Sequence, residues 1–205
     1  FEHKNYIGGR YSVLSEVGML PAELMGLNEK NFKKFNYLIK NKRFLENLII
    51  NVENIIHYVK KNKKNSIILN YDESSENFFK WYQQLTAESL GKKSKGITPI
   101  ISSMPKDNHS LLQLYLDGPK NCFFTFFNVT SKTSNKQSNK FILDDKKYLK
   151  NKNLSEILEA QEKSTQNIFR KKNIPFRSFN IKKKDENTLG ELFCFCVLET
   201  ILLGH

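Results

Sequence analysis

"SIILNYDESSENFFKWYQQLTAESLGKKSKGITPIISS", residues 66–103, places a helix-forming segment between two short apolar runs. The runs at 66–71 and 97–103 are bounded by polar turn residues, which is typical of buried strands. Residues 74–89 open with Ser and have Glu close behind, as a helix start often does. A strand, a helix and a second strand in this order predict two parallel strands joined by a helical crossover.

The same alternation continues along the chain. Apolar runs predict two further strands, at 121–129 and 174–182. Apolar spacing and composition predict the remaining helices at 13–26 with an interruption at Pro21, 28–40, 43–61, 108–118, 154–173 and 186–205. The polar residues 130–153 predict a surface excursion. The whole order predicts an α/β fold, a three-layer sandwich in which a parallel sheet is flanked by helices. In such a sheet, ligands bind beyond the carboxyl ends of the strands.

Composition sets the class of protein. The 205 residues suit one domain, and 39% apolar with 12% aromatic residues can fill a sizeable core. Lys and Arg number 33 against 21 Asp and Glu, a net charge of +12 that favours anionic partners. Most of the cations are scattered Lys, which predicts a solvated surface. A nucleic-acid reader would more often show clustered Arg among exposed aromatic residues, so nucleic-acid binding is kept only as a minor alternative.

Cysteines and apolar runs exclude several further classes. The three cysteines, Cys122, Cys194 and Cys196, are an odd number, lack a zinc spacing and lie in apolar surroundings. They are predicted to be small buried residues. No apolar run is expected to reach the length of a membrane span, and no signal peptide opens the chain. The segment "FCFCVLETILL", residues 193–203, is apolar nearly all round and is predicted to expose an apolar surface. The chain begins without Met and stops in mid-helix, so both ends are expected to be cut.

Three stretches carry residues suited to chemistry. "GGRYS" at 8–12 combines two glycines, which allow close approach to a ligand, with the permanent cation of Arg10. In "QLTAESLGK" at 84–92, Gln84 and Glu88 are one helical turn apart and project from one face. In "DNHSLLQLYLDGP" at 107–119, His109 begins a helix after the second predicted strand. Taken singly, each is more often a turn, a solvated pair or a surface histidine.

Together the three stretches resemble the glucose-6-phosphate isomerase family, in its carboxyl-terminal sugar-isomerase (SIS) domain and its bacterial type. "YIGGRYSVLSEVGMLPAELMG" is similar to the family's first signature, with Glu16 standing where the family has a small residue. "FFKWYQQLTAESLGKK" resembles the segment with the catalytic base, and "ITPI…DNHSLLQLYLDGP" the segment with the catalytic histidine. The likeness is specific over 1–119 and looser over 154–173 and 186–205.

The resemblance implies a flavodoxin-like SIS fold and the interconversion of glucose 6-phosphate and fructose 6-phosphate. This reaction moves a proton between adjacent carbons through an enediol and needs neither metal nor other cofactor. The resemblance makes Glu88 the base that carries this proton. Gln84 would bind the sugar hydroxyls or orient the carboxylate.

The other residues receive roles from the same resemblance. Arg10, with the backbone of Gly8 and Gly9, would stabilise the negative charge of the enediolate. His109 would move a proton during ring opening and would reach into the active site of a partner subunit, which makes the active unit a homodimer. The implied location is the cytoplasm, with no nucleic-acid or membrane partner.

Two parts of the family pattern have no counterpart in these residues. They are the amino-terminal SIS domain that holds the substrate phosphate and the terminal helix that carries a lysine. Residues 1–205 are therefore expected to be one SIS domain cut from a longer protein, and inactive alone. A non-catalytic sugar-phosphate-binding SIS module remains the alternative, although binding alone does not need an acid and a base.

Overall fold

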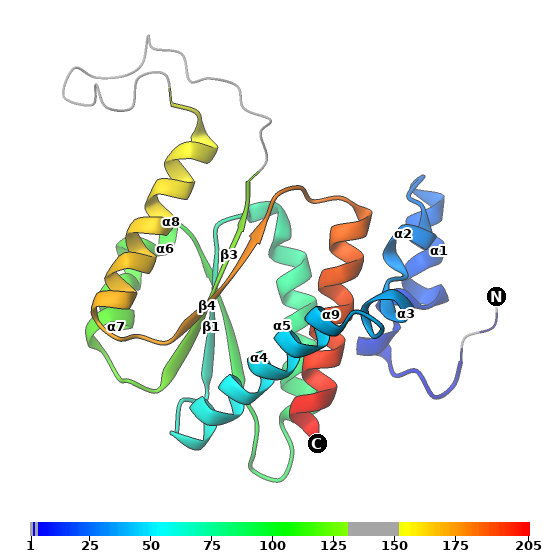
Figure 1. The fold of residues 1–205 in the computed structure, drawn as a ribbon, viewed down its shortest axis with the longest axis horizontal. Helices are drawn as coiled ribbons and strands as arrows, with labels where there is room; N and C mark the ends of the chain where they lie inside the picture. The colour runs from blue at the N-terminus through cyan, green and yellow to red at the C-terminus, as the bar shows by residue number, and fades with distance from the viewer. Residues whose placement is uncertain (1, 3, 131–151) are drawn as a thin grey trace. The chain divides into compact units, whose positions relative to one another are not determined.

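A computed structural model of the chain describes residues 2, 4–130 and 152–205. Its sheet has four strands in the order β2-β1-β3-β4, drawn in Figure 1. The strands are β1 (Asn65–Asn70), β2 (Thr98–Ser103), β3 (Cys122–Val129) and β4 (Phe176–Ile181). All four predicted strands are confirmed, to within two residues at each end.

The strand order is that of a doubly wound sheet. β3 and β4 run parallel, in a register that pairs Phe124 with Phe176 and Val129 with Ile181. Because β2 lies on one side of β1 and β3 on the other, the connection from β1 to β2 runs one way along the sheet, and the connection from β2 to β3 runs back past β1 in the other direction. This 2-1-3-4 order is the beginning of the flavodoxin-like order.

The helices follow the predicted positions with three differences. They are η1 (Gly9–Leu14, a 3-10 helix), α1 (Glu16–Leu24), α2 (Glu29–Phe32), α3 (Phe35–Leu38), α4 (Lys42–Lys60), η2 (Glu73–Ser75, also 3-10), α5 (Glu76–Leu90), α6 (Lys106–Ser110), α7 (Leu112–Asp117), α8 (Leu154–Lys171) and α9 (Glu186–Gly204). The helix predicted at 28–40 is two short helices, because the backbone leaves the helical region at Lys33. The helix at 108–118 is likewise divided at Leu111, whereas α1 continues through Pro21 instead of breaking there. The excursion predicted at 130–153 falls almost wholly outside the described residues.

The chain divides into two compact units. Unit 1 comprises Phe1–Ser66, Asn77–Ile100 and Lys184–His205, and unit 2 comprises Ile67–Glu76 and Ile101–Lys183. Each has its own apolar cluster. The prediction of a single SIS domain stays a prediction.

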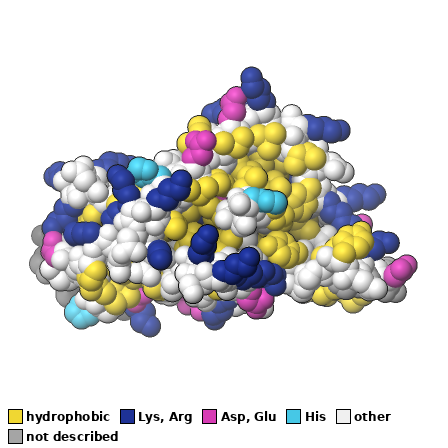
Figure 2. Space-filling model, turned by 90° about the horizontal axis from the view of Figure 1, so that it is seen from below, with side chains coloured by type: hydrophobic (Ala, Val, Ile, Leu, Met, Phe, Trp, Pro, Cys, Tyr) yellow, Lys and Arg dark blue, Asp and Glu magenta, His cyan; other side chains and the backbone are white. Residues whose placement is uncertain are grey.

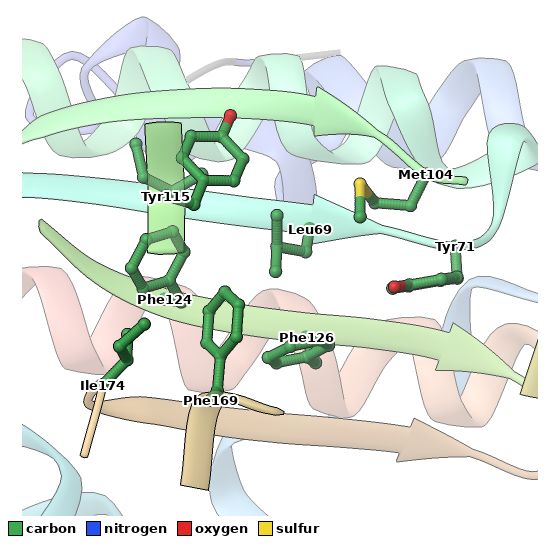
Figure 3. Packing of buried hydrophobic residues seen from close by; sticks show 9 residues of the cluster. Leu69, Tyr71, Met104, Tyr115, Phe124, Phe126, Phe169 and Ile174 are labelled. Carbon is green, nitrogen blue, oxygen red and sulfur yellow. The ribbon is translucent and has the colours of Figure 1, made fainter. Parts of the chain in front are cut away.

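The core of unit 2 lies between its strands and the helices α7 and α8. Phe169 of α8 is fully buried and packs edge-on against Phe124 and Phe126 of β3, with ring centroids 4.8 and 5.4 Å away, as Figure 3 shows. The whole cluster consists of Ile67, Leu69, Tyr71, Met104, Tyr115, Phe124, Phe126, Phe169 and Ile174. Apolar residues of the strands thus meet Phe169 of α8 and Tyr115 of α7.

Unit 1 is built around close contacts of α9. A Cβ added at Gly190 would lie 2.4 Å from the carbonyl oxygen of Phe32, so only glycine lets α2 approach this closely. One turn along α9, Phe193 packs against Trp81 of α5, with ring centroids 4.8 Å apart. Cys194 is fully buried, as predicted, and burial raises its pKa to about 11, which keeps the thiol protonated.

α9 differs from its prediction in two ways. Among the described residues, it is a helix long and apolar enough to cross a membrane by length and composition, so the expectation that no run reaches that length is wrong. Yet it is not apolar all round, because Glu199 is fully buried and accepts hydrogen bonds from the Tyr82 hydroxyl of α5 and the Asn51 amide of α4. These contacts identify α9 as a core helix of unit 1.

Apolar residues also remain exposed in unit 1. On α9 these are Ile201 and Leu202, and on α4 Ile49, Ile50 and Ile56. Figure 2 shows one face of the molecule, on which hydrophobic side chains gather with Lys and Arg along their border. The predicted exposed apolar surface is therefore confirmed for the end of α9, while its earlier residues Cys194, Cys196 and Val197 are buried.

Candidate functional site

Glu88 lies on the last turn of α5 and is held by a neighbour on the same helix face. The Gln84 amide donates a hydrogen bond of 2.8 Å from Nε2 to Oε1 of Glu88. This is the one-turn pairing that the spacing of the two residues predicted. The Glu88 side chain is 50% exposed, so its carboxylate faces solvent and is open to a ligand.

Arg10 reaches the same carboxylate from a distant part of the sequence. It stands at the start of η1, which follows Gly8, and its Nη1 lies 3.2 Å from Oε2 of Glu88. Its side chain is only 25% exposed. Two of the sequence-predicted stretches therefore meet in unit 1, and Glu88 carries a donor on each of its oxygens.

Sequence reasoning missed three residues around this cluster. Ser89 accepts a hydrogen bond of 2.8 Å from Arg10 Nε and lies 2.8 Å from the Tyr11 hydroxyl. Trp81 donates from its indole nitrogen to the backbone carbonyl of Arg10, at 2.9 Å. Trp81 is separated from Glu88 by two helical turns and so shares its face, a signal that could have identified it. Ser89 and Tyr11 have no such periodic signal.

These contacts fix the Glu88 carboxylate but do not occupy all of its lone pairs. A carboxylate has about four lone-pair positions, and among the described residues Arg10 and Gln84 donate to Glu88. Positions remain for a proton taken from a ligand. The neighbouring guanidinium supplies a fixed positive charge beside any anion that forms there.

The two glycines beside Arg10 leave open space. Gly8 and Gly9 are exposed, and a Cβ built on either meets no described atom within 4 Å. The fold of the described residues therefore does not require glycine at these positions. What the glycines provide is room for another molecule to approach the backbone next to Arg10.

His109 belongs to unit 2 and has very different surroundings. It lies on the five-residue helix α6 and is exposed. Its side chain makes no hydrogen bond or ion pair with the described residues. The helix itself is fixed by Asp107, which accepts 2.8 and 3.0 Å hydrogen bonds from the Ser103 backbone N–H and the Ser102 hydroxyl at the end of β2.

Unit 2 also contains a buried carboxyl that sequence reasoning did not predict. Glu162 of α8 is 2% exposed and accepts 2.8 Å hydrogen bonds from the amides of Asn128 and Gln166. Burial raises its pKa, against the smaller effect of the two donors. Nearby, Tyr71 donates to Thr165 at 3.3 Å, and burial raises the Tyr71 pKa to about 12. These groups tie α8 to the ends of β1 and β3.

The part of the chain that the structure describes contains no candidate metal site. No group of three or more His, Cys, Asp or Glu residues there is arranged to hold an ion.

Comparison with curated proteins adds sequence relatives to this geometry. A probable glucose-6-phosphate isomerase of Methanococcus maripaludis is 34% identical, over 100% of this chain and 47% of that protein. The glucose-6-phosphate isomerase of Campylobacter jejuni is 33% identical, over 97% of this chain and 50% of that protein. Over nearly its whole length, the chain is thus similar to proteins named glucose-6-phosphate isomerase. It spans about half the length of the curated relatives it matches. No protein-family model matches it.

Solved structures share the fold of this chain. A hypothetical protein of Thermus thermophilus matches 100% of the chain and 51% of its own, with a TM-score of 0.86 at 23% identity. A glucose-6-phosphate isomerase of Chlamydia trachomatis also matches 100% of the chain, with a TM-score of 0.73 at 17% identity, over 44% of its own length. The predicted fold class, a parallel sheet flanked by helices in three layers, is confirmed.

Proposed function

We propose that the complete protein interconverts glucose 6-phosphate and fructose 6-phosphate by proton transfer through an enediol, in the cytoplasm and without a cofactor. The observation that carries this proposal is the contact of Arg10 and Gln84 with the two oxygens of Glu88, in a chain whose relatives are named glucose-6-phosphate isomerases. A solvent-facing carboxylate with a cation beside it suits a reaction that creates negative charge next to its base.

In this proposal Glu88 takes the proton from one carbon of the open-chain sugar and returns it to the next. The carboxylate must face both carbons, so its orientation matters more than its strength. Gln84 holds one oxygen on the helix face, which leaves the other lone pairs directed at the substrate. General acid–base assistance of this kind contributes on the order of 100- to 10,000-fold.

Arg10 has the second role. The enediolate carries negative charge on oxygen that the sugar lacks, so a fixed cation there stabilises the intermediate more than the substrate. The open space beside Gly8 and Gly9 gives the sugar oxygens access to Arg10 and to the backbone. Both glycines are thus assigned to substrate binding.

His109 is assigned to ring opening, in the active site of a partner subunit. Two observations support a role outside its own chain. Its side chain is exposed and makes no polar contact with the described residues. Along the chain, Glu88 lies on α5, which precedes β2, whereas His109 lies on α6, which follows β2. A homodimer would supply each Glu88 with the histidine of the other subunit.

The alternative is a module that binds sugar phosphates without turnover. Glu88→Gln in the complete protein separates the two functions, because the amide keeps the shape of the side chain but accepts no proton. We expect wild-type protein to convert glucose 6-phosphate in a coupled assay with chelator present, and to wash solvent deuterium into carbon 2. Glu88→Gln should abolish both and still bind the sugar phosphate.

The matched control is Glu53→Gln, an exposed acid on α4, which should leave turnover unchanged. A folded wild-type protein that binds the sugar phosphate without turning it over would establish the binding module instead.

A further inference from the structure

We infer that Ser89 is a positioning residue that holds the guanidinium of Arg10 against Glu88. The inference deepens the proposed function and rests on it. It starts from the Ser89 hydroxyl, which lies 2.8 Å from Arg10 Nε and 2.8 Å from the Tyr11 hydroxyl. A serine within a helix commonly bonds to a carbonyl one turn back, whereas this one connects two side chains from near the start of the sequence.

The direction of each hydrogen bond follows from the groups present. Arg10 Nε can only donate, so the Ser89 oxygen accepts there. The hydroxyl still has a proton and a second acceptor position, and either suits Tyr11. Because a guanidinium is planar and rigid, fixing Nε fixes the plane of the whole fork. Nη1 then lies 3.2 Å from Oε2 of Glu88.

Other contacts hold Arg10 without setting this direction. Trp81 donates to the backbone carbonyl of Arg10 at 2.9 Å, which anchors the main chain. The guanidinium carbon lies 5.2 Å from the centre of the Tyr11 ring, a cation–π contact. Neither contact defines rotation about the end of the side chain. The Ser89 hydroxyl is the contact that does so.

The expected consequence is a loss in turnover more than in substrate affinity. Without Ser89, the long Arg10 side chain regains rotamer freedom and the cation is no longer held where the enediolate charge develops. Misplacement of a catalytic group by about 1 Å can cost on the order of 100-fold in rate. Ground-state binding of the sugar is expected to change little.

Kinetics of the complete protein test this. Ser89→Ala should lower kcat by about 10- to 100-fold with little change in KM. Ser89→Thr, which keeps a hydroxyl, should recover most of the loss. The control is Ser164→Ala, an exposed serine on α8, which should behave as wild type. Loss of activity in Ser89→Thr equal to that in Ser89→Ala would indicate a packing role.

A double-mutant cycle shows whether Ser89 acts through Arg10. Arg10→Lys removes the Nε donor, so Ser89→Ala should cause no further loss in that background. An undiminished further loss would overturn the inference.

A crystal structure of Ser89→Ala tests whether Ser89 holds Arg10 in place and needs no activity measurement. The Arg10–Glu88 contact should be lost there and kept in Ser164→Ala. If the wild-type protein converts no sugar phosphate, the proposed function fails, and this contact still decides the role of Ser89. Retention of the contact in Ser89→Ala would overturn the inference whatever the activity.

Discussion

The surroundings of Glu88 and His109 differ in kind. Glu88 carries a donor on each carboxylate oxygen, and one of these donors is itself held by Ser89. His109 is exposed on a five-residue helix, in which Asp107, two residues earlier, is fixed to the end of β2. A single chain thus assembles the base with its cation and leaves the histidine without a polar partner among the described residues. This difference is the one expected if, as proposed, His109 acts in the active site of a partner subunit.

His109→Ala in the complete protein is expected to give the largest effect after loss of the base. If the imidazole assists ring opening, activity on cyclic glucose 6-phosphate should fall by about 100- to 10,000-fold. An open-chain analogue, which needs no ring opening, should lose far less. Equal losses of activity on both substrates would assign His109 to binding or structure instead of ring opening. The different surroundings of Glu88 and His109 would then not reflect two chemical roles.

A smaller effect is expected from the scaffold beneath Glu88. Tyr82 and Glu88 share α5, and the buried Tyr82 hydroxyl donates to the fully buried Glu199. Tyr82→Phe leaves that carboxyl with one donor fewer and should destabilise the protein by about 1 to 3 kcal/mol. Denaturant midpoints of the complete protein measure this. Tyr37→Phe, at an exposed tyrosine of α3, is the control, and a similar shift in both variants would refute the claim that Glu199 needs this donor.

The smallest effect is expected at Glu162, a carboxyl that is buried, whereas that of Glu88 faces solvent. Glu162 is buried with amide donors from Asn128 and Gln166, and burial raises its pKa from 4.5. The folded state therefore holds the Glu162 proton to higher pH than the unfolded state does. Its contribution to stability is greatest at or below the unfolded pKa and is lost as pH rises through the raised folded pKa.

Glu162→Gln tests the direction of this pH dependence of stability. The variant should gain stability relative to wild type as pH rises above about 4.5, the unfolded value. Denaturation curves from acid to neutral pH measure the difference. Parallel pH profiles for the two proteins would show that Glu162 does not titrate as its burial implies.

Sequence patterns predicted the contacts that follow from local periodicity. Gln84 and Glu88 are one turn apart, so their pairing follows from helix geometry alone. The contact between Arg10 and Glu88 joins residues 78 positions apart, and no local pattern specifies it. Only the family resemblance placed these residues in one site.

The rest of the fold and site depended on tertiary packing. Ser89 was missed because a serine beside an acid has many ordinary uses. The helix prediction missed the break at Lys33 because the apolar spacing continues through it. Phe32 is buried on α2, and Leu38 is buried on the separate helix α3. Glu199 lies in an apolar run, and the donors Tyr82 and Asn51, from two other helices, explain a carboxyl there.

Mixing two inactive variants of the complete protein tests the central claim most directly. Homodimers of Glu88→Gln and of His109→Ala each lack one essential group in both sites. After subunit exchange, a heterodimer in which His109 acts in the partner's site contains one intact site. Random exchange should then restore about a quarter of wild-type activity. If His109 acts within its own chain, every site stays defective, and activity that remains at the level of the separate variants would contradict the account.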